Sequence, residues 1–247
     1  MLKILYNFGI FGYLCMDKSM SGAELGIYCA LSVILCIAAG YFLGSINTSI
    51  IVSKIFFGED VRNYGSGNAG TTNVLRTYGK KSALLTLLGD IAKTVIAVLI
   101  GRFVGLPVVF YSVLGDTLIP VSLGGYIAAL FAVIGHTFPI YHKFKGGKGV
   151  LSCAAAICML SPATFLAVFV IFLIIVIGTK YVSLASVITV MLYPILLDRI
   201  GGSSICTVVA LMIAALVVFN HRENIKRLLA GKENKLSVGK KDKENKK

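Results

Sequence analysis

The sequence predicts an all-α polytopic membrane protein, a bundle of seven transmembrane helices with its polar motif loops at the cytoplasmic face. The first observation is composition: 57% of the 247 residues are hydrophobic, only 14% are charged, and the mean hydropathy is +0.86. Soluble domains hold roughly 45–50% apolar residues, so a soluble globule has too little interior for this chain. The second observation is a series of nearly uncharged apolar runs, and the third is the basic residues at their ends.

Five segments are apolar enough to insert into a bilayer as helices, which need about 20 mainly apolar residues. They are Leu25–Leu43, Ser82–Gly101, Ser122–Ile140, Leu184–Leu197 and Ile205–Phe219. The polar sequence Gly44–Asn47 follows the first of them directly. We therefore expect the first spanning helix to be interrupted there.

The segment Val150–Gly178 is too long for one ordinary span. As a single helix its 29 residues would extend about 43 Å at about 1.5 Å per residue, whereas a bilayer core is about 30 Å thick. Pro162 lacks a backbone donor and disfavours helical geometry at the residue before it. We expect two short antiparallel helices joined at Ser161–Pro162, which brings the spans to seven.

The orientation of the bundle follows from its basic residues. The segment Phe103–Gly115 is too short to cross, and we expect a surface or re-entrant loop, because a span there would invert everything after it. With seven spans and an outside N-terminus, 19 of the 24 lysines and arginines lie inside, as the positive-inside rule requires. The inside segments are then Lys54–Lys81, Tyr141–Lys148, Gly178–Ser183 and the chain from His221 onward.

The chain divides into three parts. Residues 1–22 are an N-terminal extension, either interfacial or upstream of a later start at Met16 or Met20. Residues 23–230 form the transmembrane domain, and residues 231–247 form a basic, flexible cytoplasmic tail near anionic headgroups. The six cysteines lie in apolar stretches without a Cys-x-x-Cys pair, so we expect packing residues rather than a disulfide or a metal site.

The first polar loop on the inside runs from Tyr64 to Arg76. Its thirteen residues include four hydroxyls, two amides, three glycines and one arginine. Glycine N–H groups and a bidentate guanidinium are the donors that a phosphate needs. The alternative interpretation is a polar turn, which a glycine-rich sequence alone does not exclude.

The second polar loop, Gly135–Gly149, directly precedes an apolar helix and carries Lys148. Exposed glycine N–H groups, a helix N-terminus and a lysine together are typical of an anion site. The loop does not match Gly-x-x-x-x-Gly-Lys-Ser/Thr, because His142 stands at the first glycine position and Gly149 follows the lysine. Nucleotide hydrolysis is therefore disfavoured, and the sequence shows no separate acidic Mg²⁺ site.

The third polar cluster lies just after the last span. His221 and Asn224 are three residues apart, so a continuing helix places them on one face, where both can point toward the other loops. The alternative is a histidine that lies on the surface of the membrane interface and does no chemistry. Ser183 and Ser186 add hydroxyls on the same side.

Asp90 and Lys93 lie three residues apart within an apolar span. An unpaired charge at that depth is costly, so paired charges facing the interior of the bundle are the expected solution. We interpret them as a structural ion pair, with a proton relay or a direct catalytic role as the alternative.

In these motifs the sequence resembles the PlsY-type acyl-phosphate-dependent glycerol-3-phosphate acyltransferases, integral membrane enzymes of bacterial phospholipid synthesis. Four blocks carry the resemblance between Gly40 and Asn234, and they are Gly65–Arg76, Gly135–Val150, Ser183–Ser186 and His221–Ile225. Two positions depart from the family pattern. Asn47 stands where proline is usual after Gly-Ser-Ile, and Leu151-Ser152 replaces the usual Ala-Thr.

The resemblance implies transfer of a fatty acyl group from acyl phosphate to the sn-1 hydroxyl of glycerol 3-phosphate, giving 1-acyl-glycerol 3-phosphate (lysophosphatidic acid) and phosphate. It implies a multi-pass enzyme of the plasma membrane with its active site facing the cytoplasm. The partners are then acyl phosphate, glycerol 3-phosphate and the lipid bilayer, with no cofactor, metal, nucleic acid or obligate protein partner. The residues that it marks are Ser66, Arg76, Lys148, Ser186, His221 and Asn224 as catalytic and Asn68, Gly146 and Gly147 as phosphate-binding.

The expected mechanism is direct attack by the glycerol hydroxyl, because the resemblance gives no reason to invoke an acyl-enzyme. Lys148, Arg76 and N–H groups near Gly146 would stabilise phosphate charge, and the serines, His221 and Asn224 would orient the substrates. The His-x-x-x-x-Asp pair of acyl-CoA-dependent glycerolipid acyltransferases is absent. The hydroxyl proton would pass to a substrate phosphate oxygen or to the histidine.

Two other functions fit a polytopic chain of this composition. A multipass transporter of an anionic solute also binds anions at broken helices and helix N-termini, but its site should lie near the bilayer midplane. The polar motifs here cluster at span ends on one side, which favours an enzyme. An accessory membrane protein that keeps the fold without turnover is the third interpretation, and the intact motif residues argue against it.

Overall fold

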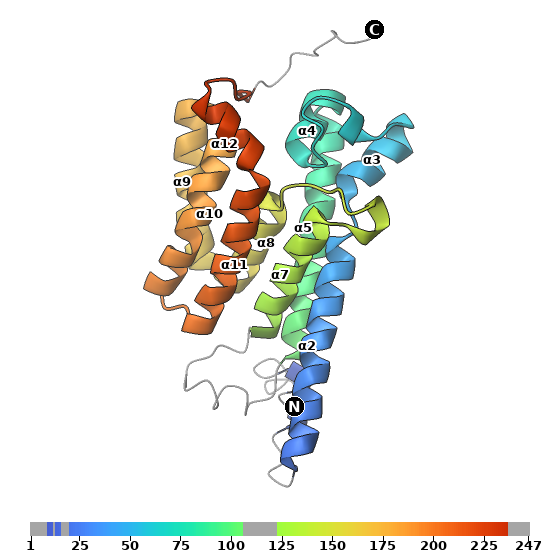
Figure 1. The fold of residues 1–247 in the computed structure, drawn as a ribbon, viewed down its shortest axis with the longest axis vertical. Coiled ribbons are helices and arrows are strands. Elements are labelled where there is room, and N and C mark those ends of the chain that lie inside the picture. The colour runs from blue at the N-terminus through green and yellow to red at the C-terminus, as the bar shows by residue number, and fades with distance from the viewer. Residues whose placement is uncertain (1–8, 12, 16–19, 106–122, 237–247) are drawn as a thin grey trace.

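The computed structural model describes residues 9–11, 13–15, 20–105 and 123–236. Within these ranges every regular element is a helix, and no strand is present. Figure 1 shows the long helices running roughly side by side as one bundle. The all-α fold class predicted from the composition is confirmed for the described part of the chain.

Between residues 20 and 236, the described part of the chain contains ten α-helices and two 3₁₀ turns, η1 and η2. They are α2 (Gly22–Gly44), α3 (Thr48–Phe57), η1 (Val61–Asn63), α4 (Thr71–Tyr78), α5 (Lys80–Val104), α7 (Leu123–Thr137), η2 (Ile140–His142), α8 (Val150–Leu160), α9 (Pro162–Thr179), α10 (Val182–Arg199), α11 (Ser204–Asn220) and α12 (Arg222–Leu229). The short helices α3, α4 and α12 were not expected from hydropathy, because they are brief and partly polar.

The polytopic character of the chain is confirmed, but the number of spans is not settled at seven. Among the described residues, five stretches have the length and composition to cross a bilayer, and a sixth arises if α11 and α12 cross as one pair bent by 57°. With 11 residues, α8 is shorter than the roughly 17-residue minimum of a spanning helix. The count of seven therefore stays a prediction.

The predicted break near Pro162 is confirmed. α8 ends at Leu160, and α9 begins with Pro162 in its first turn, where a missing backbone N–H removes no intrahelical hydrogen bond.

The loop expected over Phe103–Gly115 lies mostly outside the described residues. α5 runs to Val104, and residues 106–122 lie outside the described part of the chain.

The predicted interruption of the first helix at Gly44–Asn47 is also confirmed. α2 ends at Gly44, and the Oδ1 atom of Asn47 accepts hydrogen bonds from the N–H of Ile50 at 3.3 Å and from Ser49 Oγ at 2.6 Å. Asn47 thereby caps α3. An asparagine in place of the usual proline thus still supports a helix break, since it begins the next helix with a side-chain cap.

The expected ion pair between Asp90 and Lys93 is confirmed, with 2.9 Å between Nζ and Oδ1 and both side chains buried. Lys93 Nζ also donates to the carbonyls of Gly44 at 3.0 Å and Ile46 at 2.8 Å, and lies 2.9 Å from Nδ1 of His136. The carbonyls at a helix end need partners when no water is near. Lys93 therefore stabilises the break between α2 and α3 from inside the bundle.

Two groups of helices face each other across the bundle. α2, α5 and α7 pack closely on one side, and α9, α10 and α11 pack on the other, with α8 against both α5 and α9 (Figure 1). α9 leaves large apolar side chains exposed, including Ile174 and Ile177 at 65% and 75%. Such exposure suits contact with lipid rather than water. The candidate site lies between the two groups.

Candidate active site

One cavity of about 420 Å³ lies where the polar loops meet the helices. Its polar lining includes residues of all four motif blocks. Its apolar lining comes mainly from α8, α9 and α10, and includes Ile157, Phe165, Val168, Phe169, Phe172 and Val190. The cavity therefore joins a hydrophilic region to a hydrophobic one.

The structure brings most of the predicted site residues together. The predicted residues that line the cavity are Ser66, Asn68, Arg76, Lys148, Ser186, His221 and Asn224. They come from sequence positions up to 158 residues apart, so only the tertiary fold assembles them. Gly146 and Gly147 are not among the lining residues.

The loop that carries Ser66 is held by Asn73, a residue to which the sequence analysis gives no separate role. Asn73 Nδ2 donates to the carbonyls of Val61 at 3.1 Å and Tyr64 at 3.0 Å, and its Oδ1 accepts from the Ser66 N–H at 2.9 Å. Asn73 is buried. Gly65 has φ +57°, and a Cβ there would collide with Oδ1 of Asn73. This close approach sets the position of Ser66.

Arg76, near the end of α4, lies at the cavity and faces the chain that follows α12. Its Nη2 donates hydrogen bonds to the carbonyl oxygens of Asn234 and Lys235, and both are long at 3.5 Å. The guanidinium is thus only weakly held. Replacing these two hydrogen bonds by contacts with a phosphate should cost little free energy, because a bidentate pair between a guanidinium and a phosphate is stronger.

The expectation that the N–H groups of Gly146 and Gly147 bind phosphate does not fit the structure. The Gly146 N–H donates to the Thr137 carbonyl at 3.0 Å, and the Gly147 N–H donates to the His136 carbonyl at 3.1 Å. A Cβ at Gly147 would collide with the ring of His136. These glycines are needed for close packing, which brings Lys148 to the cavity wall.

Lys148 is the central cation of the cavity. Its Nζ donates to Oδ1 of Asn224. Burial lowers the pKa of Lys148 to about 8, and the nearby cations Arg227 and Arg76 act in the same direction, while Glu233 opposes the shift. The ammonium is therefore charged at neutral pH but loses its proton more easily than an ordinary lysine.

His221 and Asn224 both line the cavity, although the helix does not continue straight through them as their three-residue spacing assumed: α11 ends at Asn220 and α12 starts at Arg222 after a bend of 57°. The Nδ1 of His221 lies 2.7 Å from the Val217 carbonyl, which can only accept a hydrogen bond, so Nδ1 carries the proton. In the neutral ring Nε2 then has a free lone pair. His221 is buried and lines the cavity. The structure does not place it as a surface histidine.

Ser186 is buried against the cavity, and its hydroxyl donates to the Val182 carbonyl at 2.8 Å. Its oxygen lone pairs remain available as acceptors. In the present arrangement Ser186 is therefore an acceptor toward the cavity rather than a donor. A donor role would require rotation of its hydroxyl.

Glu233 belongs to the site, although its lysine-rich surroundings predict a flexible tail. One carboxylate oxygen accepts from Ser183 Oγ at 2.9 Å and Asn224 Nδ2 at 2.7 Å, and the other accepts from Arg227 Nε at 2.8 Å. Burial raises the pKa of Glu233, but these hydrogen bonds outweigh it and the net shift is downward. Glu233 is therefore a structured anion that orients Asn224.

The segment around Glu233 packs on the bundle. The Leu236 N–H donates to the Lys180 carbonyl at 2.8 Å, and Lys235 Nζ lies 5.6 Å from the centre of the Tyr181 ring. Residues 231–236 thus cross from α12 to the start of α10, in contrast to the flexible tail expected from residue 231. Residues 237–247 lie outside the described part of the chain.

Four helices begin at the cavity, and none of the four has a side-chain cap. They are α4, α8, α10 and α12. Elsewhere α2, α3 and α11 are capped by Ser21, Asn47 and Ser203, while α5 and α9 also lack a side-chain cap. Uncapped N–H groups and the positive end of the helix dipole attract anions. Together with Lys148, Arg76 and Arg227 they make the hydrophilic region suited to phosphate.

The described residues contain no group of three histidine, cysteine, aspartate or glutamate side chains close enough to hold a metal ion. Positive charge in the cavity comes from side-chain cations and helix N-termini among those residues. The arrangement can hold an anionic group beside an apolar chain, with a histidine nitrogen lone pair nearby.

Comparison with known sequences gives a consistent result. Residues 34–231 match the family model described as Glycerol-3-phosphate acyltransferase. A glycerol-3-phosphate acyltransferase of Clostridioides difficile (strain 630) is 43% identical over 205 residues, which cover 83% of this chain and 96% of that protein. One from Geotalea daltonii is 40% identical over 203 residues, covering 82% and 97% respectively.

Comparison with solved structures agrees. A crystal structure of PlsY (YgiH), an integral membrane glycerol 3-phosphate acyltransferase in its glycerol 3-phosphate form, has a TM-score of 0.72 and 34% identity. The match covers 83% of this chain and 96% of the PlsY chain. The lysophosphatidic acid form of PlsY has a TM-score of 0.69 and 32% identity, covering 84% and 96%.

Proposed function

The chain belongs to the glycerol-3-phosphate acyltransferase family, and from this premise we propose that its cavity transfers a fatty acyl group from acyl phosphate to the sn-1 hydroxyl of glycerol 3-phosphate. The products are 1-acyl-glycerol 3-phosphate and inorganic phosphate. The observation that carries the proposal is one cavity in which a cationic region adjoins an apolar one. A donor with a phosphate head and a fatty chain needs both.

Each substrate matches a part of the cavity. Both substrates carry phosphate, which the uncapped helix N-termini, Lys148 and Arg76 attract. The acyl chain would lie along the apolar walls of α8, α9 and α10, where side chains such as Phe169 line the cavity. The exposed apolar surface of α9 gives the fatty acyl chain of the donor a route from the bilayer to the cavity.

The proposed reaction is one acyl transfer without an acyl-enzyme. The glycerol oxygen attacks the carbonyl carbon, the bond from that carbon to the phosphate oxygen breaks, and phosphate leaves with the bonding electrons. The hydroxyl proton has two acceptors, the Nε2 lone pair of His221 and a phosphate oxygen of the substrate. Both keep the proton count balanced.

Electrostatic stabilisation should supply the largest part of the rate enhancement. Charge moves onto the departing phosphate in the transition state, and prearranged donors act most strongly there. Lys148 and Arg76 are the side chains proposed for this role. Ser66, Ser186 and Asn224 line the same cavity and are proposed to orient the substrates.

The proposed location is the plasma membrane, with the site facing the cytoplasm. The basic segments contribute Arg76, Lys148 and Arg227 to the cavity lining, and the positive-inside rule places such segments in the cytoplasm. α4 and α12 lie toward the same end of the bundle in Figure 1. A site at helix ends supports acyl transfer over alternating-access transport, which would require a site near the midplane.

The experiment that tests the proposal supplies purified protein with glycerol 3-phosphate and one of three donors: acyl phosphate, acyl-CoA or acyl carrier protein. Lysophosphatidic acid is measured in each reaction. We expect product from acyl phosphate alone. Product only from a thioester would reject the proposed donor, and no product from any donor would reject the proposed function.

A further inference from the structure

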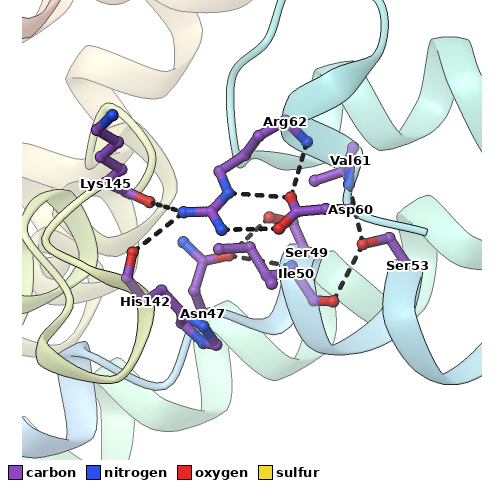
Figure 2. Close-up of polar contacts among 9 residues, drawn as sticks. All are labelled: Asn47, Ser49, Ile50, Ser53, Asp60, Val61, Arg62, His142 and Lys145. Atoms are coloured by element: carbon purple, nitrogen blue, oxygen red, sulfur yellow. Dashed lines mark hydrogen bonds and ion pairs between the residues drawn. The ribbon is translucent and has the colours of Figure 1, made fainter. Parts of the chain in front are cut away.

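Arg62, outside the cavity, joins the first polar loop to the second (Figure 2). Its Nη1 donates to two carbonyls of the second loop, His142 at 3.1 Å and Lys145 at 2.8 Å. Nε and Nη2 donate to the two carboxylate oxygens of Asp60 at 2.9 Å and 2.7 Å. The planar guanidinium is thus held by the carboxylate on one side and holds the second loop on the other.

The two carbonyls bracket a strained turn. Lys143 and Phe144 have φ of 55° and 56°, the left-handed region that residues with a Cβ rarely adopt. No glycine stands at either position, so local preference does not create this turn. The turn places the carbonyls of His142 and Lys145 on one guanidinium nitrogen. The charged hydrogen bonds to Arg62 therefore offset the backbone strain.

On its other side Arg62 is fixed to the loop of Ser66. η1 starts at Val61, whose N–H donates to Ser53 Oγ at 3.1 Å, as Figure 2 shows. The Val61 carbonyl accepts from Asn73, which also binds the Ser66 N–H. A continuous series of contacts thus runs from the turn at 143–144 through Arg62 to Ser66.

Resting on the proposed function, we infer that Arg62 is a positioning residue that sets the distance between the Ser66 loop and the Lys148 loop. The Lys145 carbonyl that Arg62 holds and the Gly146 N–H that binds the Thr137 carbonyl belong to one peptide unit. A shift of the turn therefore moves this unit and weakens its hydrogen bond to α7, which displaces the backbone that leads directly to Lys148. Arg62 acts through the loops and touches no substrate.

The test compares Arg62→Ala with Arg199→Ala, an exposed arginine far along α10. We expect Arg62→Ala to lower kcat/KM for glycerol 3-phosphate by about 100-fold, mainly through kcat, because a small misplacement of catalytic groups has such an effect. Its unfolding midpoint should fall below that of the control, because charged hydrogen bonds are lost, and the turnover of both variants is therefore measured well below either midpoint. Arg62→Lys should lie in between, since an ammonium cannot bridge a carboxylate and two carbonyls in one plane.

A second set of variants tests the strained turn itself. Adding Lys143→Gly and Phe144→Gly to Arg62→Ala should recover about tenfold of the lost kcat/KM, because glycine adopts left-handed geometry without penalty. A purely global loss of stability would not be reversed by two glycines. No recovery would show that Arg62 does not act through this turn.

Hydrogen exchange gives a measurement independent of turnover. In Arg62→Ala the amides of residues 61–73 and 140–147 should exchange faster than in wild type, while those of α10 and α11 should not change. Unchanged exchange in both loops would overturn the inference. So would a loss of kcat/KM in Arg62→Ala that is fully explained by a smaller fraction of folded protein. If wild type transfers no acyl group from any donor, the proposed function fails, and exchange alone decides the role of Arg62.

Discussion

Lys148 donates a hydrogen bond to Asn224, a residue 76 positions further along the chain. The contact joins the loop before α8 to the first turn of α12, and Glu233 binds the other end of the same amide at 2.7 Å. Asn224 is therefore oriented from both sides, with its oxygen toward the cation and its nitrogen toward the anion. This orientation makes the lysine, the asparagine and the glutamate one unit.

Removing the carboxylate charge in Glu233→Gln should weaken this unit. The side chain of Glu233 is 7% exposed and holds Asn224, Ser183 and Arg227. Hydrogen bonds to a charged group are worth about 1.5–3 kcal/mol, so the unfolding midpoint and kcat/KM should both fall. Because its pKa is lowered on folding, this stabilisation is present at neutral pH and lost as the pH falls.

The matched control is Glu223→Gln. Glu223 is 58% exposed and, among the described residues, pairs with the exposed Lys226; such surface pairs contribute about 0–1 kcal/mol. Thermal unfolding and turnover of both variants can be measured under the same conditions. Equal, small effects for the two glutamates would contradict the account of Glu233.

The pH dependence of kcat/KM should show the titration of Lys148. Burial lowers its pKa to about 8, so the phosphate-attracting charge is present below that pH and disappears above it. Activity should decline as the pH rises through about 8, and Lys148→Arg should move that decline upward, because a guanidinium stays charged. An alkaline limb unchanged by the arginine would mean that another group titrates there.

His221→Gln separates the two acceptors proposed for the glycerol proton. Glutamine keeps a polar side chain but has no basic nitrogen. If Nε2 of His221 is the acceptor, the variant should lose the acid limb of the kcat/KM profile as well as rate. A lower rate with an unchanged profile would assign the proton to a substrate oxygen and leave His221 as an orienting group.

Gly147→Ala tests why glycine is required before Lys148. A Cβ at Gly147 would collide with the ring of His136, whereas Gly178 in α9 has open space around it. Overpacking typically costs about 1–3 kcal/mol, so Gly147→Ala should lower the unfolding midpoint and displace Lys148. Gly178→Ala is the control and should be neutral or stabilising. Normal turnover in Gly147→Ala would contradict the packing role.

Local rules predicted several parts of this fold. The helix break at Pro162, the interruption after Gly44 and the pairing of Asp90 with Lys93 depend on residues close in sequence and on the cost of burying polar groups. The chemistry of the glycine-rich loops already indicated Arg76 and Lys148 as phosphate-binding cations. The spacing of His221 and Asn224 left a surface histidine as the alternative, and the resemblance to a known family selected the seven cavity-lining residues together.

Other parts depend on contacts that no local pattern shows. Glu233 stands in a lysine-rich segment whose composition favours disorder, and its partners lie on α10 and α12. The amide of Asn73 is one of many polar groups in its loop until the fold brings Val61 and Tyr64 to it. Glycines such as Gly147 suggest phosphate binding, but close helix packing also requires glycine.

The most direct test of the central claim measures acyl transfer by Lys148→Ala and Arg76→Ala, with Lys226→Ala and Arg199→Ala as surface controls. If these two cations stabilise phosphate in one cavity, each variant should lose about 10²–10³-fold in kcat, as when other preorganised donors are removed. Both should remain folded at the assay temperature, which a cooperative thermal transition well above that temperature would show. Near-normal turnover in both folded variants would contradict the claim that this cavity is the site of reaction.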